Sequence, residues 1–366
     1  MNNHVSEAAE QFGPRGRIID IREYGNGNIN ITFLVTVDNG KETKFILQRI
    51  NTQVFHHPEL VMFNMRISTE HMRRRLQSAP LISGRRWEVP RVLSTQEGRD
   101  LWLAPDGSFW RAISFIDRSQ FFDTIRNTGH AGEAGYALGM FHNLLSDLPP
   151  DRLSDTLKGF HITPLYFEHY NEVLAKQGPG KSPGIDHCRQ FINERSAFVN
   201  VLENAKEQGK LRLRTIHGDP KINNIMIEII TGQAISIIDL DTVKPGLVHY
   251  DIGDCLRSGC NPMGEETEQP EKVYFDLDIC RAILQGYLSI AREFLSINDF
   301  EYLYDSIRLL TFELGLRFFT DYLEGNVYFR TRHPEHNIIR ALVQFKLTES
   351  IESQEKAIRS IIKGLR

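Results

Sequence analysis

Five polar side chains crowd into eight residues of this 366-residue chain, directly before an apolar segment. The stretch 217–224 reads HGDPKINN, and IMIEII follows it. A second apolar segment, AISII, follows the tight turn at 231–233, so the two segments predict a β-hairpin. Asn224 precedes the first strand and Asp239 follows the second, and we therefore expect these two residues to meet at the open end of the hairpin.

Asp219 lies five residues before Asn224 and can reach the same place across a loop. Two carboxylates and an amide oxygen in one cluster favour a cation, and oxygen ligands of this kind are what Mg²⁺ prefers. The order Asp-x4-Asn, with a later Asp after the next strand, is also the arrangement that phosphoryl transfer uses in kinases. We interpret Asp219 as the catalytic base, and Asn224 and Asp239 as magnesium ligands. The alternative is that Asp219 and Asn224 cap turns and that Asp239 ends a strand.

The composition is that of an ordinary globular protein, with a formal net charge of −4 and 41% hydrophobic residues. This balance does not favour a nucleic-acid partner, and the triplet Arg73–Arg75 is typical of a solvated helix face. The four cysteines show no C-x-x-C spacing, as expected of reduced thiols in the cytosol. Residues 1–17 form a polar leader without the apolar core of a signal peptide, and no apolar run approaches a membrane span. We expect a cytoplasmic protein with no membrane partner.

The hydrophobic patterns separate a strand-rich front from a helix-rich back. Residues 18–50 alternate β-branched and polar side chains around Asp38-Asn39-Gly40, which predicts a hairpin with its turn there. Residues 58–76 carry apolar side chains at helical spacing, and two further strands are predicted around 100–104 and 110–116. Beyond that point helical patterns dominate. We predict an α+β protein of two lobes, residues 1–115 and residues 116–366.

HGDPKINN followed by IIDLD resembles the catalytic signature of the aminoglycoside phosphotransferase and choline kinase superfamily. These are small-molecule kinases with a protein-kinase-like fold. The resemblance covers nearly the whole chain and is closer still to the N-acetylhexosamine 1-kinases, which phosphorylate the anomeric hydroxyl of N-acetylglucosamine and N-acetylgalactosamine. The other segments that carry it are YGNGNINITFLV, FILQRIN, WRAISFID, YDIGDCLRSG and LRFFTDYLEGNVYFRTRHPEHN.

The resemblance implies roles for residues outside the catalytic signature. Gly25, Asn26 and Gly27, on the turn between the first two strands, match the loop that covers the nucleotide phosphates. The segment 115–117 falls between the lobes, where its backbone would bind adenine; the alternative is a plain strand end. Asp241 is implied to reach a second metal or the sugar. The residues of the adenine-binding segment are Phe115, Ile116 and Asp117.

One position departs from the protein-kinase pattern. Protein kinases place a lysine on the third strand, where it holds the α- and β-phosphates and pairs with a glutamate of the following helix. Here the strand reads KFILQRI and places Gln48 at the position of the lysine, while Glu70 lies on the helix that follows. We assign Gln48 and Glu70 to the nucleotide site. The residue that holds the phosphates in place of the lysine is not identified by the sequence.

Acceptor recognition is expected in the back lobe. Arg317 lies in a mostly apolar helix, and a charge there needs a partner or a ligand. The resemblance implies that Arg317 and Tyr328 contact the sugar and that Asn28 lies at the edge of its pocket. The alternative is that Arg317 pairs with a structural aspartate, such as Asp321 or Asp254.

The resemblance thus implies that residues 1–115 bind the nucleotide and that residues 116–366 carry the catalytic and acceptor-binding groups. It also implies transfer of the γ-phosphate of ATP, with Mg²⁺, to the anomeric 1-hydroxyl of an N-acetylhexosamine held against Asp219. The expected partners are this amino sugar and ATP. One alternative is a kinase acting on an amino alcohol, an aminoglycoside or a plain hexose. A second is a regulatory protein that binds nucleotide without turnover, although the retention of Asp219, Asn224 and Asp239 together argues against it.

Overall fold

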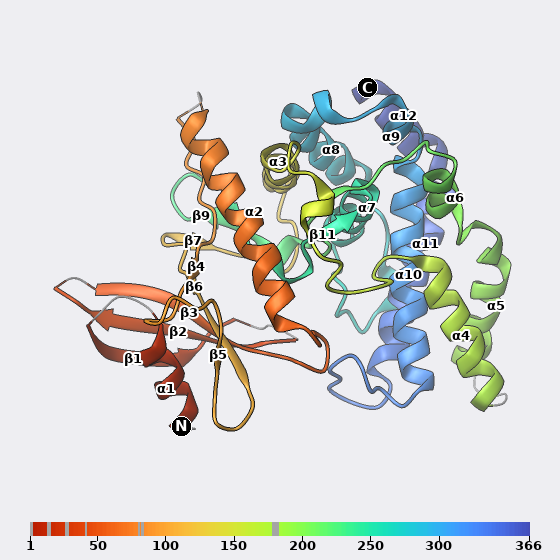
Figure 1. The fold of residues 1–366 in the computed structure, drawn as a ribbon. Coiled ribbons are helices and arrows are strands. Elements are labelled where there is room, and N and C mark those ends of the chain that lie inside the picture. Colours follow the sequence, from red (N-terminus) through yellow and green to blue (C-terminus); the bar gives the residue numbers. More distant parts are fainter. Residues whose placement is uncertain are drawn as a thin grey trace.

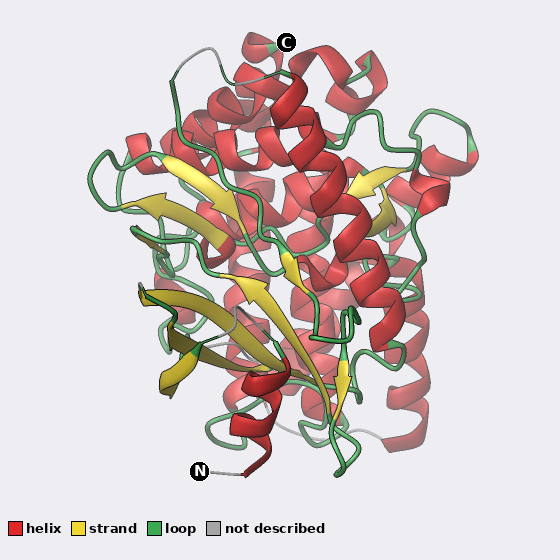
Figure 2. Ribbon diagram, turned by 60° about the vertical axis from the view of Figure 1, so that its left-hand side comes forward, coloured by secondary structure: helices red, strands yellow, loops and turns green. Residues whose placement is uncertain are grey.

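The computed structural model describes residues 3–12, 16–25, 29–40, 42–79, 81, 84–177 and 183–366 of the chain. Strands gather in its N-terminal part and helices make up most of the remainder (Figures 1 and 2). The arrangement confirms the predicted α+β class. Among the described residues, no helix is both long and apolar enough to cross a membrane.

The front sheet is antiparallel and has six strands, in the order β1-β2-β3-β6-β4, with β5 paired to β6. Asp38 pairs with Glu42 at the start of the β2–β3 register, so the predicted hairpin and its turn are both confirmed. The predicted strand around 110–116 is β6. The strands are β1 (Arg17–Glu23), β2 (Ile31–Asp38), β3 (Glu42–Ile50), β4 (Val92–Leu93), β5 (Trp102–Leu103) and β6 (Phe109–Ser114).

Helix α1 (Asn3–Gln11) covers one face of this sheet. Ala8 and Phe12 are buried against Val35 and Leu47 of the sheet. The expectation of a polar leader before the first strand was therefore wrong. The apolar residues at 5, 8, 9 and 12 follow a helical period, but the segment is too short for that period to stand out in the sequence.

Helix α2 (Pro58–Ser78) is the helix predicted from residue 58 onward, and it joins the front sheet to the back of the protein. Its Asn64 is buried, and the side-chain amide donates to the carbonyls of Ser154, at 2.7 Å, and Val243, at 2.9 Å. Both carbonyls belong to the helical part of the chain. Figure 1 shows α2 between the sheet and the helices. This helix therefore fixes the front sheet relative to the segment that follows Asp239.

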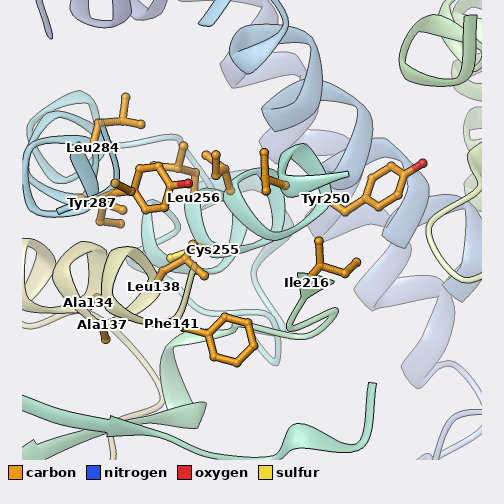
Figure 3. Packing of buried hydrophobic residues seen from close by; sticks show 14 of the residues in the cluster. Ala134, Ala137, Leu138, Phe141, Ile216, Tyr250, Cys255, Leu256, Leu284 and Tyr287 are labelled. Carbon is orange, nitrogen blue, oxygen red and sulfur yellow. The ribbon is translucent and has the colours of Figure 1, made fainter. Parts of the chain in front are cut away.

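The helical part is built around α3, α7 and α8, whose buried side chains form the largest apolar cluster. Figure 3 shows Phe141 of α3, Leu256 of α7 and Tyr287 of α8 packed together near Ile216 of β8. A second cluster forms where α10 packs on α11 and α4, and where α5 packs on α11. The helices are α3 (Thr128–Leu144), α4 (Thr163–Gln177), α5 (Pro183–Arg195), α6 (Val201–Glu207), α7 (Val248–Gly259), α8 (Leu277–Ala291), α9 (Ile297–Glu301), α10 (Leu303–Leu323), α11 (His336–Ser353) and α12 (Glu355–Leu365).

Helices α3 and α8 approach closely through glycines. A Cβ atom on Gly286 of α8 would lie 1.9 Å from the carbonyl oxygen of Gly132, and one on Gly135 of α3 would lie 1.9 Å from that of Ile283. The obstructing atoms belong to the backbone, so side-chain rotation cannot relieve the clash. We expect Gly286→Ala to lower the free energy of unfolding by about 2 kcal/mol or more. Urea unfolding measures this, with Gly364→Ala as the control.

Gly364 lies in α12, and a Cβ atom there would have no neighbour within 4 Å. Gly364→Ala should leave the urea midpoint unchanged or raise it slightly, because alanine favours a helix more than glycine does. A midpoint for Gly286→Ala equal to that of Gly364→Ala would contradict the close packing of α3 on α8.

Two short sheets hold the segment that contains the polar cluster. The predicted hairpin is present, and Ile238 N–H donates to Asn224 O at 2.9 Å, which places Asn224 beside the residue that precedes Asp239. The turn of this hairpin leaves Ile230 exposed. The strands are β7 (Ser119–Gln120), β9 (Ile225–Glu228) and β10 (Ala234–Ile237) in one sheet, and β8 (Arg214–Ile216) and β11 (Lys244–Gly246) in the other.

Candidate active site

The loop between β8 and β9 is fixed by a buried carboxylate of α7. Asp251 accepts from the backbone N–H groups of His217, at 2.7 Å, and Gly218, at 2.8 Å, and it lies 2.8 Å from His142 Nε2. Burial alone would raise the pKa of Asp251, but the hydrogen bond and charge of His142 outweigh it and hold that pKa below its ordinary value. Asp251 therefore stays ionised and orients the loop that carries Asp219.

Gly218 cannot be another residue without strain. Its φ is +86°, and a Cβ atom would lie 2.7 Å from the carbonyl oxygen of Thr242. His217 next to it is completely buried, and its Nδ1 accepts from Asp219 N–H at 3.2 Å while Nε2 lies 2.9 Å from Ile238 O. Burial lowers the pKa of His217, which fits a neutral ring that donates through Nε2. His217 thus positions the backbone of Asp219.

Asp219 keeps its carboxylate partly accessible, with 30% of the side chain exposed. Lys221 Nζ lies 2.9 Å from Asp219 Oδ2, and Asn224 Nδ2 donates to the carbonyl oxygen of Asp219 at 2.8 Å. Burial would lower the pKa of Lys221, but the carboxylates of Asp219 and Asp239 outweigh it and raise that pKa. The positive charge of Lys221 therefore lies directly beside the Asp219 carboxylate.

Asp239 follows β10 in a left-handed backbone conformation, with φ 64° and ψ 58°. Solvent reaches its side chain, and no described residue hydrogen-bonds to its carboxylate or forms an ion pair with it. Protein packed around the cleft raises the pKa of Asp239 to about 7, and the neighbouring Asp241 adds to this shift. A carboxylate whose charge is destabilised by its surroundings is a good ligand for a cation.

The donor set suits a cation that brings further ligands with it. Asn224 uses its side-chain N–H₂ toward Asp219, and no described residue donates to its Oδ1. The described residues contain no group of three or more His, Cys, Asp or Glu side chains that would hold a metal by themselves. Magnesium bound by Asn224 and Asp239 would need additional oxygens, which nucleotide phosphates supply.

Asp241, two residues beyond Asp239, lies deeper than the sequence implied. Its Oδ2 accepts from Asn30 Nδ2 at 2.6 Å, and its Oδ1 lies 2.5 Å from Arg111 Nη1. Asn30 in turn accepts from Asn51 N–H at 2.9 Å. These contacts join the front sheet to the end of the β9–β10 hairpin, so Asp241 connects the two parts of the protein.

The two front-sheet candidates do not meet: Gln48 contacts the neighbouring strands, and Glu70 faces outward. Gln48 of β3 donates from Nε2 to Thr32 Oγ1 at 3.0 Å and accepts from Arg111 Nε at 2.9 Å. Glu70 lies on the exposed face of α2 and pairs with Arg66 at 3.1 Å. An inward-facing Glu70 beside Gln48 is therefore not observed, because its helical position turns it toward Arg66.

The remaining nucleotide candidates lie near the start of the sheet and between the two parts of the protein. Gly25 has φ +78° and open space around its Cβ position. Asn26, Gly27 and Asn28 lie outside the described residues. The segment of Phe115, Ile116 and Asp117 links β6 to β7: Ser119 Oγ donates to Ile116 O at 2.7 Å, and Arg86 Nη2 donates to Asp117 O at 2.9 Å. Phe115 lies edge-on to Tyr24, with ring centroids 5.9 Å apart.

A pocket of about 150 Å³ opens beside the Asp219 carboxylate. Ile29 and Phe55 line it from the front part of the protein and Asp254 and Arg317 from the back, so it lies between the two parts. The guanidinium carbon of Arg317 lies 4.9 to 6.0 Å from the centroids of four aromatic rings. These rings belong to Phe160, Tyr166, Tyr328 and Phe329.

Arg317 has no hydrogen bond or ion pair with any described residue. Asp321 is occupied by the backbone N–H groups of 327–329, at 2.7 to 2.9 Å, and holds that loop in place. Asp254 Oδ1 accepts from Arg257 Nε at 2.8 Å, and its Oδ2 is buried without a partner. Neither aspartate pairs with Arg317. The alternative that this arginine forms a structural ion pair with one of them is therefore not observed.

Sequence reasoning missed a buried pair that links the pocket to the catalytic loop. His161 has φ 65°; its Nε2 lies 2.7 Å from Gly218 O and its Nδ1 lies 2.9 Å from Glu313 Oε1. Burial would lower the pKa of His161, but Glu313 outweighs it and raises that pKa. A protonated His161 donates through both nitrogens. Only the lone glutamate within the apolar helix α10 signals this pair in the sequence.

Three solved structures share this fold over nearly the whole chain. The amicoumacin kinase hAmiN, in complex with AMP-PNP, Ca²⁺ and Ami, matches with a TM-score of 0.62 and 13% identity, over 96% of this chain and 93% of that one. The microcompartment-associated aminopropanol kinase gives 0.60 and 15%, over 97% and 98%. Choline kinase from Cryptosporidium parvum gives 0.58 and 14%, over 94% and 93%. The fold is therefore that of small-molecule kinases.

The family follows from the sequence itself. The model of the phosphotransferase enzyme family, APH, matches residues 20–278, which is more than half of the chain. The chain belongs to this family. The match confirms the broader of the two resemblances seen in the sequence, that to the aminoglycoside phosphotransferase superfamily.

Proposed function

We propose that the protein is an ATP-dependent kinase that transfers the γ-phosphate to the anomeric 1-hydroxyl of an N-acetylhexosamine, N-acetylglucosamine or N-acetylgalactosamine. The observation that carries this proposal is the unpaired Arg317 guanidinium in the same pocket as the Asp219 carboxylate. The residues around it favour a neutral acceptor that both donates and accepts hydrogen bonds.

The pocket offers complementary groups to such an acceptor. Arg317 donates only, and suits an amide carbonyl oxygen. The free Oδ2 of Asp254 accepts, and suits a sugar hydroxyl. Tyr328 and Phe329 present rings against which a sugar face and an acetyl methyl group can pack. A cationic group placed beside Arg317 would meet its positive charge, which disfavours an amino alcohol or an aminoglycoside at that end of the pocket.

The proposed transfer begins with the acceptor hydroxyl hydrogen-bonded to Asp219. Asp219 accepts the hydroxyl proton while the oxygen forms its bond to the γ-phosphorus, and the bond from that phosphorus to the bridging oxygen breaks to release ADP. Asn224 and Asp239 would hold Mg²⁺, which neutralises phosphate charge when bound. His161 and His217 keep the loop in place during this step.

The nucleotide is proposed to lie under the front sheet. The loop of Gly25, Asn26 and Gly27 would cover its phosphates, and the backbone at 115–117 would bind adenine. Residues 1–115 and 116–366 remain our division into two lobes. Asn28 would lie at the edge of the acceptor pocket.

The acceptor preference tests this proposal. We expect N-acetylglucosamine or N-acetylgalactosamine to exceed glucose and galactose in kcat/KM by about tenfold or more, because a site built for an amide leaves polar groups unpaired when the amide is missing. Steady-state ADP release with each sugar, choline, ethanolamine, homoserine and an aminoglycoside measures it. Turnover confined to an amine-bearing acceptor would sink the proposal.

The variant Arg317→Met tests whether the pocket sets the preference for N-acetylated sugars. It should lower kcat/KM for N-acetylated sugars by about 10- to 100-fold without changing the Kd of ATP, because it removes a charged donor and keeps an apolar chain. Arg308→Met is the matched control: Arg308 lies on the same helix and over an aromatic ring, Phe198, but pairs with Glu352 away from the pocket. Equal losses in both variants would show a general effect on α10.

A further inference from the structure

The position on β3 that carries a lysine in protein kinases holds an uncharged residue in this chain. Gln48 stands on β3 where a lysine would hold the α- and β-phosphates of the nucleotide. The neighbouring strand supplies a cation instead: in the β3–β6 register, Gln48 and Arg111 are direct partners. Figure 1 shows β3 and β6 in the same sheet, and the order of strands makes them neighbours. Directly opposed residues project to the same face of the sheet.

Arg111 is 1% exposed, so its charge needs compensation. Gln48 Oε1 accepts from its Nε at 2.9 Å, and the amide of Gln48 is itself fixed by its bond to Thr32. Asp241 Oδ1 lies 2.5 Å from Nη1. Gln48 is therefore a positioning residue that aims the guanidinium of Arg111 at the end of the β9–β10 hairpin.

The guanidinium retains an unused donor group at Nη2, whereas Nη1 donates to Met62 Sδ at 3.9 Å. Its contact with Asp241 is an ion pair without hydrogen-bond geometry, because Asp241 Oδ1 is among the buried oxygens that have no hydrogen-bond partner. Nη2 hydrogen-bonds to no described residue. It is also not completely buried. Asp241 is also held by Asn30, so it does not depend on Arg111 alone for a polar partner.

We propose that Arg111, supplied from β6, binds the phosphates of the nucleoside triphosphate in place of a β3 lysine. This inference rests on the proposed kinase function and deepens it. Asp241 lies two residues from Asp239, the proposed metal ligand, so its ion pair with Arg111 brings the guanidinium near the proposed magnesium site. A guanidinium stays protonated and binds two phosphate oxygens at once.

The test moves the positive charge from position 111 on β6 to position 48 on β3. Arg111→Gln should weaken binding of Mg²⁺-ATP by about 10- to 100-fold, while the KM of the acceptor changes less than about twofold. The double variant Gln48→Lys/Arg111→Gln restores a lysine on β3 and should recover most of the lost affinity. Calorimetric titration with ATP and no acceptor measures both. Because no acceptor is present, a wrong choice of sugar cannot mimic failure of this inference.

Two controls separate binding from folding. Arg66→Gln removes an arginine that pairs with Asp100 in the front part and should leave the Kd of ATP unchanged. If Arg111→Gln fails to fold, Arg111→Gln/Asp241→Asn removes the unpaired carboxylate as well and should fold with the same loss of affinity. Unchanged ATP binding in a folded variant without Arg111, or a loss that Gln48→Lys does not reverse, would overturn the proposal.

Discussion

Asp219→Asn should lower kcat by about 10²–10⁴-fold and leave the Kd of ATP within about a factor of two. The amide has the shape of the carboxylate but cannot accept the proton of the attacking hydroxyl. The backbone of Asp219 is held by His217 and Asn224, so the loop should keep its conformation in the variant. Rapid-quench measurement of phosphoryl transfer separates this chemical step from product release.

The matched control is Asp155→Asn. Asp155 also pairs with a lysine, Lys244, at 2.6 Å, but it does not line the pocket beside Asp219. Loss of an Asp–Lys pair alone would affect both variants, whereas loss of a base affects only Asp219→Asn. Near-full activity in Asp219→Asn would remove this residue from the role of base.

Asp239→Asn should reduce turnover by about 10³-fold or more while the protein stays folded, because the proposed Mg²⁺ site loses its unpaired carboxylate. The stability of this variant distinguishes a metal-ligand role of Asp239 from a structural role. The pKa of Asp239, raised to about 7 by the surrounding protein and Asp241, means that its ionised form is disfavoured in the metal-free protein. Asparagine removes that charge and tolerates the left-handed backbone, so the urea midpoint at pH 8 without metal should not fall.

Metal dependence completes this test. Activity of the unmodified protein should vanish with a chelator and return with Mg²⁺, whereas the midpoint of Asp239→Asn should respond to Mg²⁺-ATP less than that of the unmodified protein. Transfer that resists the chelator would contradict the metal assignment. A clear drop in the midpoint of Asp239→Asn would favour the structural role of a strand end.

Local patterns were sufficient for much of the fold. The hairpins, α2 and the meeting of Asn224 with the residue before Asp239 follow from alternation and turn residues within short segments. The face of Glu70 did not follow, because only the docking of α2 through Asn64 determines which side of that helix is covered. Helix α1 was missed because its few apolar residues are buried only by contact with the front sheet, which the local sequence does not show.

The site residues that escaped prediction depend on contacts between distant segments. Arg111 and Asp241 are brought together by the joining of the front sheet to the hairpin, and no local spacing encodes this. In the sequence, Asp251 and Glu313 are isolated charged residues in helical segments. In the structure, Asp251 accepts from the Gly218 N–H and Glu313 pairs with His161. In each case the signal is a charged residue within an apolar element, which marks a buried polar group without identifying its partner.

We propose that this site phosphorylates the anomeric oxygen of an N-acetylated hexosamine. The most direct measurement is phosphorus and proton NMR of the product formed from N-acetylglucosamine, ATP and Mg²⁺. We expect one new phosphate monoester whose phosphorus couples to the anomeric proton. A phosphate on the 6-hydroxyl, or no sugar phosphate while an amine-bearing acceptor turns over, would contradict it.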